Sequence, residues 1–70
     1  MLNEKKLKAK MIEQGYNVSK LSKGIGIDNT TFYRKVSKNT FSLKEVDSIT
    51  EILNLSKEDA IEIFFTNVGA

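Results

Sequence analysis

The sequence predicts a small all-α protein, a bundle of five short helices in one domain over residues 1–70. Apolar residues recur three, four or seven positions apart, the spacing that places side chains on one face of a helix. Residues that cap helices, such as Asn, Asp and Ser, precede these segments, and Gly or Asn follows them. The chain contains no proline, which would interrupt a helix.

The first helix is expected over about residues 3–14. Three apolar residues mark its inward side: Leu7, Met11 and Ile12. Gly15 is placed to end this helix in the left-handed conformation, after which Tyr16 can fold back onto Met11. We expect the first two or three residues, and residues 67–70, to lack fixed structure.

Residues 17–36 predict two short helices joined by a tight turn. In the first of them, apolar residues lie at i, i+3 and i+7: Val18, Leu21 and Ile25. Gly26 can end that helix with a positive φ, and Asp28 can cap the next one. Phe32 and Val36 then form the buried side of the third helix, which leaves its other residues facing outward.

Residues 41–46 contain the clearest helix start in the sequence. Ser42 and Glu45 have the spacing of a capping box, and Phe41 and Val46 have that of a hydrophobic staple. The apolar residues of this fourth helix predict an inward stripe: Leu43, Val46, Ile49, Ile52 and Leu53. Asn54 can end the helix.

A fifth helix is expected from Ser56, with Asp59 in its first turn, to about Thr66. This segment carries more apolar side chains than a small core needs: Ile61, Ile63, Phe64, Phe65 and Val68. Two interpretations of Phe64 and Phe65 remain open. They seal the bundle, or they form a homodimer contact through the C-terminal helix.

The charges are unevenly distributed along the chain. Residues 1–44 hold ten Lys or Arg and three acids, a balance of +7, whereas residues 45–70 hold one Lys and six acids, a balance of −5. This asymmetry indicates that one part of the surface meets a polyanion. The alternative is a solvated first helix that is rich in lysine.

Several kinds of chemistry are excluded by composition. Without Cys and His, the chain has no disulfide, no usual zinc site and no activated serine, and it contains no glycine-rich phosphate loop. We therefore expect no enzyme, no metal, no cofactor and no small-molecule substrate. No apolar run is long enough for a membrane span or a signal peptide, so we expect a soluble, cytoplasmic protein.

The pair of helices over residues 17–36 resembles the helix-turn-helix of the Cro/repressor family of phage DNA-binding proteins, the lambda repressor-like domains. Five residues stand at the structural positions of that family: Leu21, Gly26, Ile27, Asp28 and Phe32. The sequence departs from the family at Val18, where a phosphate-contacting Gln is frequent, and at Ser22, where Ala is frequent. The resemblance implies that the third helix, over about residues 28–37, enters the major groove of double-stranded DNA.

The outward residues of the third helix have the chemistry of base recognition. An Asn amide matches adenine, a guanidinium matches guanine, and a Thr methyl can contact the thymine methyl. The base-reading candidates are Asn29, Thr30 and Arg34. The DNA-backbone candidates are Ser19, Lys20, Tyr33, Lys35, Lys38, Asn39 and Thr40. We expect residues 37–40 to form a loop, which either follows the DNA backbone or is an ordinary connector.

These observations predict a sequence-specific transcriptional regulator of phage or prophage type. The alternative is a protein-interaction module on the same scaffold, such as an antitoxin-like subunit, in which DNA binding is secondary. The two hypotheses differ at Arg34. A DNA-binding protein needs this guanidinium free, whereas an interaction module can tie it to an acid.

Overall fold

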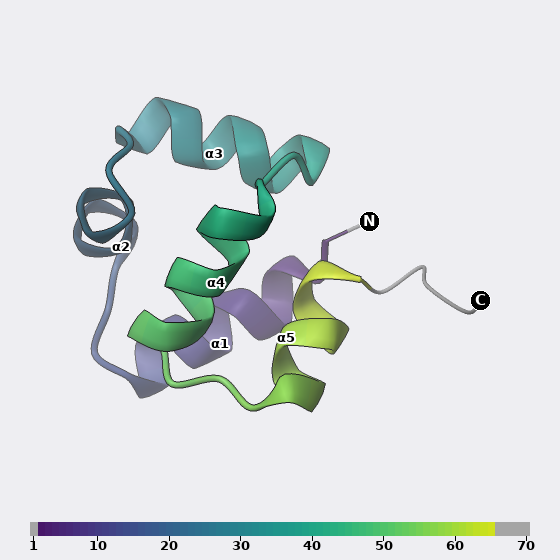
Figure 1. Ribbon diagram of the computed structural model, residues 1–70. Coiled ribbons are helices and arrows are strands. Elements are labelled where there is room, and N and C mark those ends of the chain that lie inside the picture. The colour runs from purple at the N-terminus through teal and green to yellow at the C-terminus, as the bar shows by residue number, and fades with distance from the viewer. Residues whose placement is uncertain (1, 66–70) are drawn as a thin grey trace.

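The computed structural model describes residues 2–65, which form helices and loops without a strand (Figure 1). The helices are α1 (Glu4–Glu13), α2 (Val18–Gly24), α3 (Asn29–Lys38), α4 (Leu43–Ile52) and α5 (Lys57–Phe64). The prediction of an all-α bundle of five helices is confirmed. None of these helices is long and apolar enough to cross a lipid bilayer.

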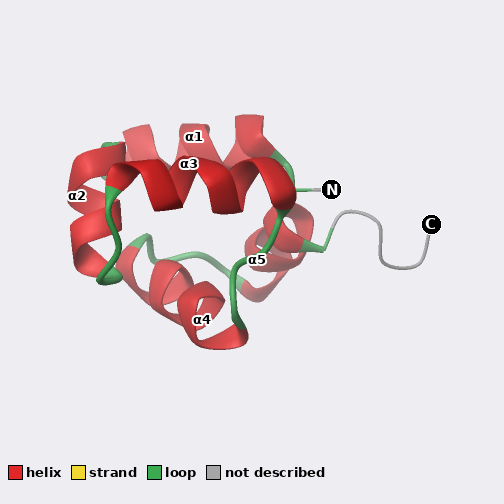
Figure 2. Ribbon diagram, turned by 90° about the horizontal axis from the view of Figure 1, so that it is seen from above, coloured by secondary structure: helices red, strands yellow, loops and turns green. Residues whose placement is uncertain are grey.

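The helices pack so that α3 lies along one edge of the molecule. In Figure 1, α3 forms the upper edge and α4, α1 and α5 lie below it. α2 packs against α3 and α4, and α5 packs against α1 and α4. Seen from above in Figure 2, α3 crosses this face with α2 at its N-terminal end. One side of α3 therefore faces away from the bundle.

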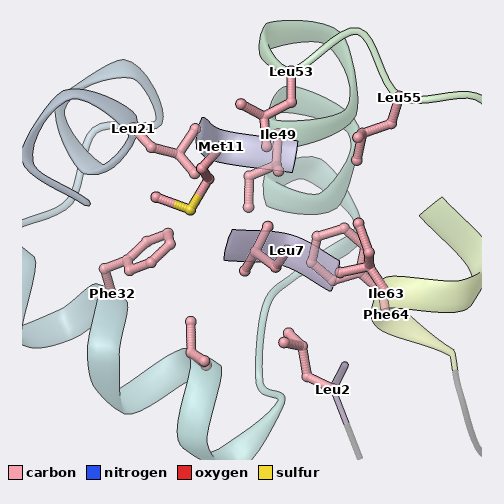
Figure 3. Packing of buried hydrophobic residues seen from close by; sticks show 11 residues of the cluster. Leu2, Leu7, Met11, Leu21, Phe32, Ile49, Leu53, Leu55, Ile63 and Phe64 are labelled. Carbon is pink, nitrogen blue, oxygen red and sulfur yellow. The ribbon is translucent and has the colours of Figure 1, made fainter. Parts of the chain in front are cut away.

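All five helices contribute to one hydrophobic core. Figure 3 shows their side chains pointing toward one another. The buried members are Leu2, Leu7, Met11, Leu21, Phe32, Val36, Ile49, Leu53, Leu55, Ile63 and Phe64. Phe41, in the loop between α3 and α4, contacts Phe32 and Phe64 edge to face, with ring centroids 5.7 and 5.9 Å apart. These aromatic contacts connect the loop to both α3 and α5.

Each helix begins with a polar side chain that accepts the backbone N–H three residues further on. The caps are Asn3, Asn17, Asp28, Ser42 and Ser56. α4 and α5 have complete capping boxes, formed by Ser42 with Glu45 and by Ser56 with Asp59. The helix starts predicted from these residues are confirmed.

Four helices end in the same way, with a residue of positive φ after the last turn. These residues are Gly15, Gly26, Asn39 and Asn54, with φ of 74°, 80°, 52° and 52°. In each case the next N–H donates to the carbonyl five residues earlier, over 2.7 to 3.1 Å, which is a Schellman motif. α3 ends at Lys38, one residue beyond the recognition helix predicted over about 28–37 and two residues into the predicted loop 37–40, so Ser37 and Lys38 are helical.

Two apolar residues predicted to face inward are exposed. Ile12 is 77% exposed and Leu43 is 76% exposed, so these predictions are wrong. Leu43 lies six positions before the buried Ile49, which places it about 120° around α4 from that residue. Ile12 is likewise turned by about 100° from its buried neighbour Met11.

The N-terminal residues are more ordered than predicted. Leu2 is only 7% exposed, and the N–H of Asn3 donates to the carbonyl of Ile63 over 2.8 Å. The prediction that these two residues lack fixed structure is therefore wrong. The corresponding prediction for residues 67–70 lies outside the described residues, as do Thr66 and Val68.

The two phenylalanines of the C-terminal segment have different environments. Phe64 is 3% exposed and belongs to the core, whereas Phe65 is 39% exposed. Ile61, four residues earlier, is also exposed, and Ile63 is buried. Among residues 2–65, Ile61 and Phe65 are therefore the exposed large apolar residues of this segment, and Phe64 seals the bundle.

Candidate nucleic-acid interface

A tight turn over residues 25–28 joins α2 to α3. Gly26 closes the Schellman motif of α2, in which the N–H of Ile27 donates to the carbonyl of Ser22 over 3.0 Å. Asp28 then accepts the N–H of Thr31 over 2.7 Å. Hydrogen bonds from Thr31 lower the pKa of Asp28, and so favour the charged form of this cap.

The outward side of α3 carries the base-reading candidates. Asn29, Thr30 and Arg34 are all exposed, while Phe32 and Val36 on the opposite side are buried. Ser37 is exposed on the same side, because it lies one helical turn beyond Arg34. Ser37 is not among the predicted site residues, because the polar segment 37–40 has the composition of a loop. Recognising Asn39 as a left-handed helix end would have included it.

Asn29 is connected to the beginning of α2. Its amide Nδ2 donates to Ser19 Oγ over 3.0 Å. The bond joins a base-reading candidate to a backbone candidate across the two helices, and it limits the orientations that the Asn29 side chain can adopt. The structure therefore brings these two predicted residues together.

Arg34 has no acidic partner among the residues that the structure describes. In residues 2–65, no carboxylate oxygen lies within the 4.0 Å that defines an ion pair with this residue. Its guanidinium is thus available to an external partner, as the DNA-binding hypothesis requires.

Among the backbone candidates, five have side chains open to solvent: Ser19, Lys20, Tyr33, Lys38 and Thr40. Lys20 Nζ lies 4.9 Å from the centre of the Tyr16 ring, a cation–π distance that orients the ammonium. Tyr33 is exposed and touches Phe32 edge to face. Lys20 belongs to α2, Tyr33 and Lys38 belong to α3, and Thr40 follows the end of α3.

Two other backbone candidates are engaged within the protein. Lys35 Nζ forms an ion pair with Glu45 at 2.8 Å. Asn39 Nδ2 donates to the carbonyl of Phe64 over 3.2 Å, which ties the end of α3 to the end of α5. A contact between Lys35 and a DNA phosphate would require its ion pair to open.

The charge asymmetry of the sequence is partly cancelled by folding. Lys6 contacts Asp59 at 3.2 Å and also pairs with Glu62, and Lys10 contacts Asp59 at 3.3 Å. These pairs connect α1 to α5. The basic side chains without an ion pair in residues 2–65 are Lys5, Lys20, Lys23, Arg34, Lys38, Lys44 and Lys57.

The whole bundle matches a known family. Residues 6–65 match the family model of the Cro/C1-type HTH DNA-binding domain. The chain belongs to this family. The match runs from α1 to the end of α5, so the Cro/C1-type domain includes the helices that support α3 as well as the helix-turn-helix itself. No curated protein and no solved structure gave a significant match.

Proposed function

We propose that this Cro/C1-type domain is a sequence-specific transcriptional regulator that places α3 in the major groove of operator DNA. The observation that carries the proposal is the exposed guanidinium of Arg34, which has no ion pair in residues 2–65 and lies one helical turn from Thr30 on the outward side of α3. A helix fits the width of the major groove, and its outward side chains then meet the edges of the bases.

Three side chains are proposed to read bases. Arg34 donates two hydrogen bonds to guanine O6 and N7, and Asn29 pairs its amide with adenine N6 and N7. Thr30 contacts a thymine methyl. Ser19 supports this arrangement through its 3.0 Å hydrogen bond with the Asn29 amide. That bond reduces the freedom that Asn29 loses when it meets a base.

Phosphate contacts are proposed for the exposed polar residues around α3: Ser19, Lys20, Tyr33, Lys38 and Thr40. Lys20 and Lys38 supply charge, and the hydroxyl groups supply neutral hydrogen bonds. The side chain of Asn39 already binds the Phe64 carbonyl, so in this proposal its role is to position the end of α3.

The proposed regulator is of phage or prophage type, acts in the cytoplasm and binds DNA as a homodimer. Exposed Ile61 on α5 and exposed Phe65, which directly follows α5, support the dimer contact, because they lie four positions apart, about one helical turn. Dimers of such domains bind half-sites roughly 34 Å apart. Sedimentation of the chain and of Phe65→Glu tests this contact, with loss of the dimer in the variant expected.

The test of base reading compares Arg34→Ala with Lys38→Ala, since each variant removes one positive charge. Bound duplexes are first selected from a random pool. Arg34→Ala is expected to weaken binding to the selected sequence by about 1–3 kcal/mol and binding to random DNA far less. Lys38→Ala should weaken binding to both DNAs alike. It should also reduce the slope of log K against log salt by about one unit. Equal weakening of both DNAs by Arg34→Ala would assign this residue to the backbone.

A second candidate function is a protein-interaction module, an antitoxin-like subunit that holds a different protein. The exposed pair Ile61 and Phe65 favours it as well, since either kind of partner can cover an apolar surface. If the chain binds no duplex in the selection at low salt, the protein-interaction module replaces the regulator as the proposed function.

A further inference from the structure

Lys35 of α3 is held by Glu45 of α4. Its Nζ donates to both carboxylate oxygens, over 2.8 Å to Oε1 and 2.9 Å to Oε2. The side chains of Lys35 and Glu45 are only 23% and 16% exposed, so salt screens this pair less than it screens a pair in open solvent. The pair connects the proposed recognition helix to the helix that follows it.

The Glu45 carboxylate is itself ordered by the start of α4. Its Oε1 accepts the N–H of Ser42 over 2.9 Å, and Ser42 Oγ accepts the N–H of Glu45 over 3.1 Å. The hydrogen bond from Lys35, followed by that from the Ser42 N–H, lowers the pKa of Glu45. The capping box therefore holds the Glu45 carboxylate in place for Lys35, so less side-chain freedom is lost in forming the pair.

Lys35 lies beside the cations that are proposed to contact DNA. Arg34 precedes it directly, and Lys38 lies one helical turn further along α3. Neither Arg34 nor Lys38 has an acid within ion-pair distance in residues 2–65, whereas Lys35 has both oxygens of one. The end of the Lys35 side chain is turned toward α4, and its charge is balanced there.

We propose that Glu45 withholds Lys35 from the DNA phosphates and thereby sets the strength and the salt dependence of DNA binding. This inference rests on the proposed function. A lysine that neutralises a phosphate releases counterions and strengthens binding to any duplex, whatever its sequence. With Lys35 held by Glu45, Lys38 is the lysine of α3 that is left for the phosphates, and base recognition by Asn29, Thr30 and Arg34 supplies the sequence-specific part of the affinity.

The test variant is Glu45→Gln, because Gln can still form a capping box but cannot balance the charge of Lys35. We expect Glu45→Gln to bind selected and random duplexes more tightly than the wild type at low salt. The slope of log K against log salt should steepen by about 0.9, so that affinity falls about 3.5-fold more between 50 and 200 mM salt. If Glu45 had only a structural role, its replacement would weaken DNA binding.

Two controls separate the release of Lys35 from the loss of a negative charge. Glu51→Gln removes an exposed acid of the same helix that has no ion pair in residues 2–65, and it should leave the slope unchanged. The double variant Lys35→Gln, Glu45→Gln should lose the gain in affinity and return to the wild-type slope. Thermal unfolding of each variant confirms that the bundle is intact.

Three outcomes would overturn the inference. The first is an unchanged slope in Glu45→Gln, and the second is a gain that persists in the double variant. The third is a slope in the single variant Lys35→Gln that is about 0.9 shallower than the slope of the wild type, because Lys35 would then already contact a phosphate in the wild type. Wild-type chain that binds no duplex would instead refute the proposed function, so the two failures are distinguishable.

Discussion

Ser22 places a hydroxyl in the core without a hydrogen-bond partner. It is 1% exposed, and its Oγ makes no hydrogen bond to the described residues. An unsatisfied buried polar group costs about 1–3 kcal/mol. Ser22→Ala should therefore raise the free energy of unfolding by about 1 kcal/mol or more, measured by urea denaturation.

The control for Ser22 is Ser37→Ala, which makes the same exchange at an exposed position of α3. Alanine also favours helix formation, by at most ~0.7 kcal/mol per residue, and Ser37→Ala measures this contribution. A gain in Ser22→Ala no larger than that in Ser37→Ala would show that the buried hydroxyl is satisfied.

Gly24 and Gly26 differ in what an added methyl group would meet. At Gly26, φ is +80° and no atom lies within 4 Å of a Cβ, so Gly26→Ala should destabilise by about 1–2 kcal/mol through backbone strain alone. At Gly24, in the last turn of α2, a Cβ would lie 3.1 Å from Ile52 Cδ1. This contact opposes the helix-propensity gain of about 1 kcal/mol.

A double-mutant cycle measures how much the contact with Ile52 costs in Gly24→Ala. Ile52→Val removes the Cδ1 atom, so Gly24→Ala should be more stabilising in the Ile52→Val background than in the wild type. Equal effects in both backgrounds would mean that the Ile52 side chain moves aside without cost. Denaturation midpoints of the four proteins decide between these outcomes.

At the level of the helix, α3 depends on Asn39 for its end. Asn39 adopts a φ of 52° and also donates its amide to the carbonyl of Phe64, whereas Asn54 adopts the same φ at the end of α4 without a side-chain hydrogen bond to the described residues. Glycine tolerates positive φ in both places. Asn39→Gly should destabilise by about 1 kcal/mol more than Asn54→Gly, which is the net value of one hydrogen bond.

Calorimetry of the two variants tests this difference. Equal losses at Asn39 and Asn54 would show that the bond to Phe64 contributes nothing to stability. A selective loss at Asn39 should also weaken DNA binding, because the proposed phosphate contacts at Lys38 and Thr40 adjoin this residue.

Local signals explain which helices were predictable. The start of α4 was predicted correctly because the capping box of Ser42 and Glu45 lies within four residues of sequence. The end of α3 was misplaced because Asn39, unlike Gly26, is a common loop residue, and its left-handed conformation is supported by a distant carbonyl on α5. Leu43 was assigned inward by its apolar nature, although helical geometry turns it outward.

For the candidate site, the exposure of Asn29, Thr30 and Arg34 follows from helical periodicity and agrees with their predicted outward positions. The roles of these residues remain predictions. The ion pair between Lys35 and Glu45 was not predictable, because it depends on how α3 and α4 pack together. The sequence shows only two residues of opposite charge that lie ten positions apart.

Across the whole molecule, the charge cluster between α1 and α5 should make stability depend on pH. Desolvation acts to raise the pKa of Asp59, but hydrogen bonds from Lys6, from Ser56 and from Lys10 outweigh it and lower the pKa from 3.8 to about 2. Because the folded state has the lower pKa, Asp59 stabilises the fold above pH 3.8, and this contribution is lost as pH falls toward 2.

Unfolding free energies between pH 6 and pH 2 check this expectation, since Asp59→Asn should flatten the part of the acid decline that falls between about pH 4 and pH 2. Asp47→Asn serves as the control, because Asp47 is exposed and has no ion pair in residues 2–65. A decline in Asp59→Asn as steep as that of the wild type would contradict the proposed linkage.

The hydrogen bond from the Asn3 N–H to the Ile63 carbonyl brings the beginning and the end of the described chain together. Chains whose ends adjoin tolerate circular permutation, in which a linker joins the ends and new termini open at another exposed turn. The same bundle is therefore accessible to a chain that presents its helices in a different order. The helix-turn-helix then remains intact as long as the new opening lies outside residues 17–38.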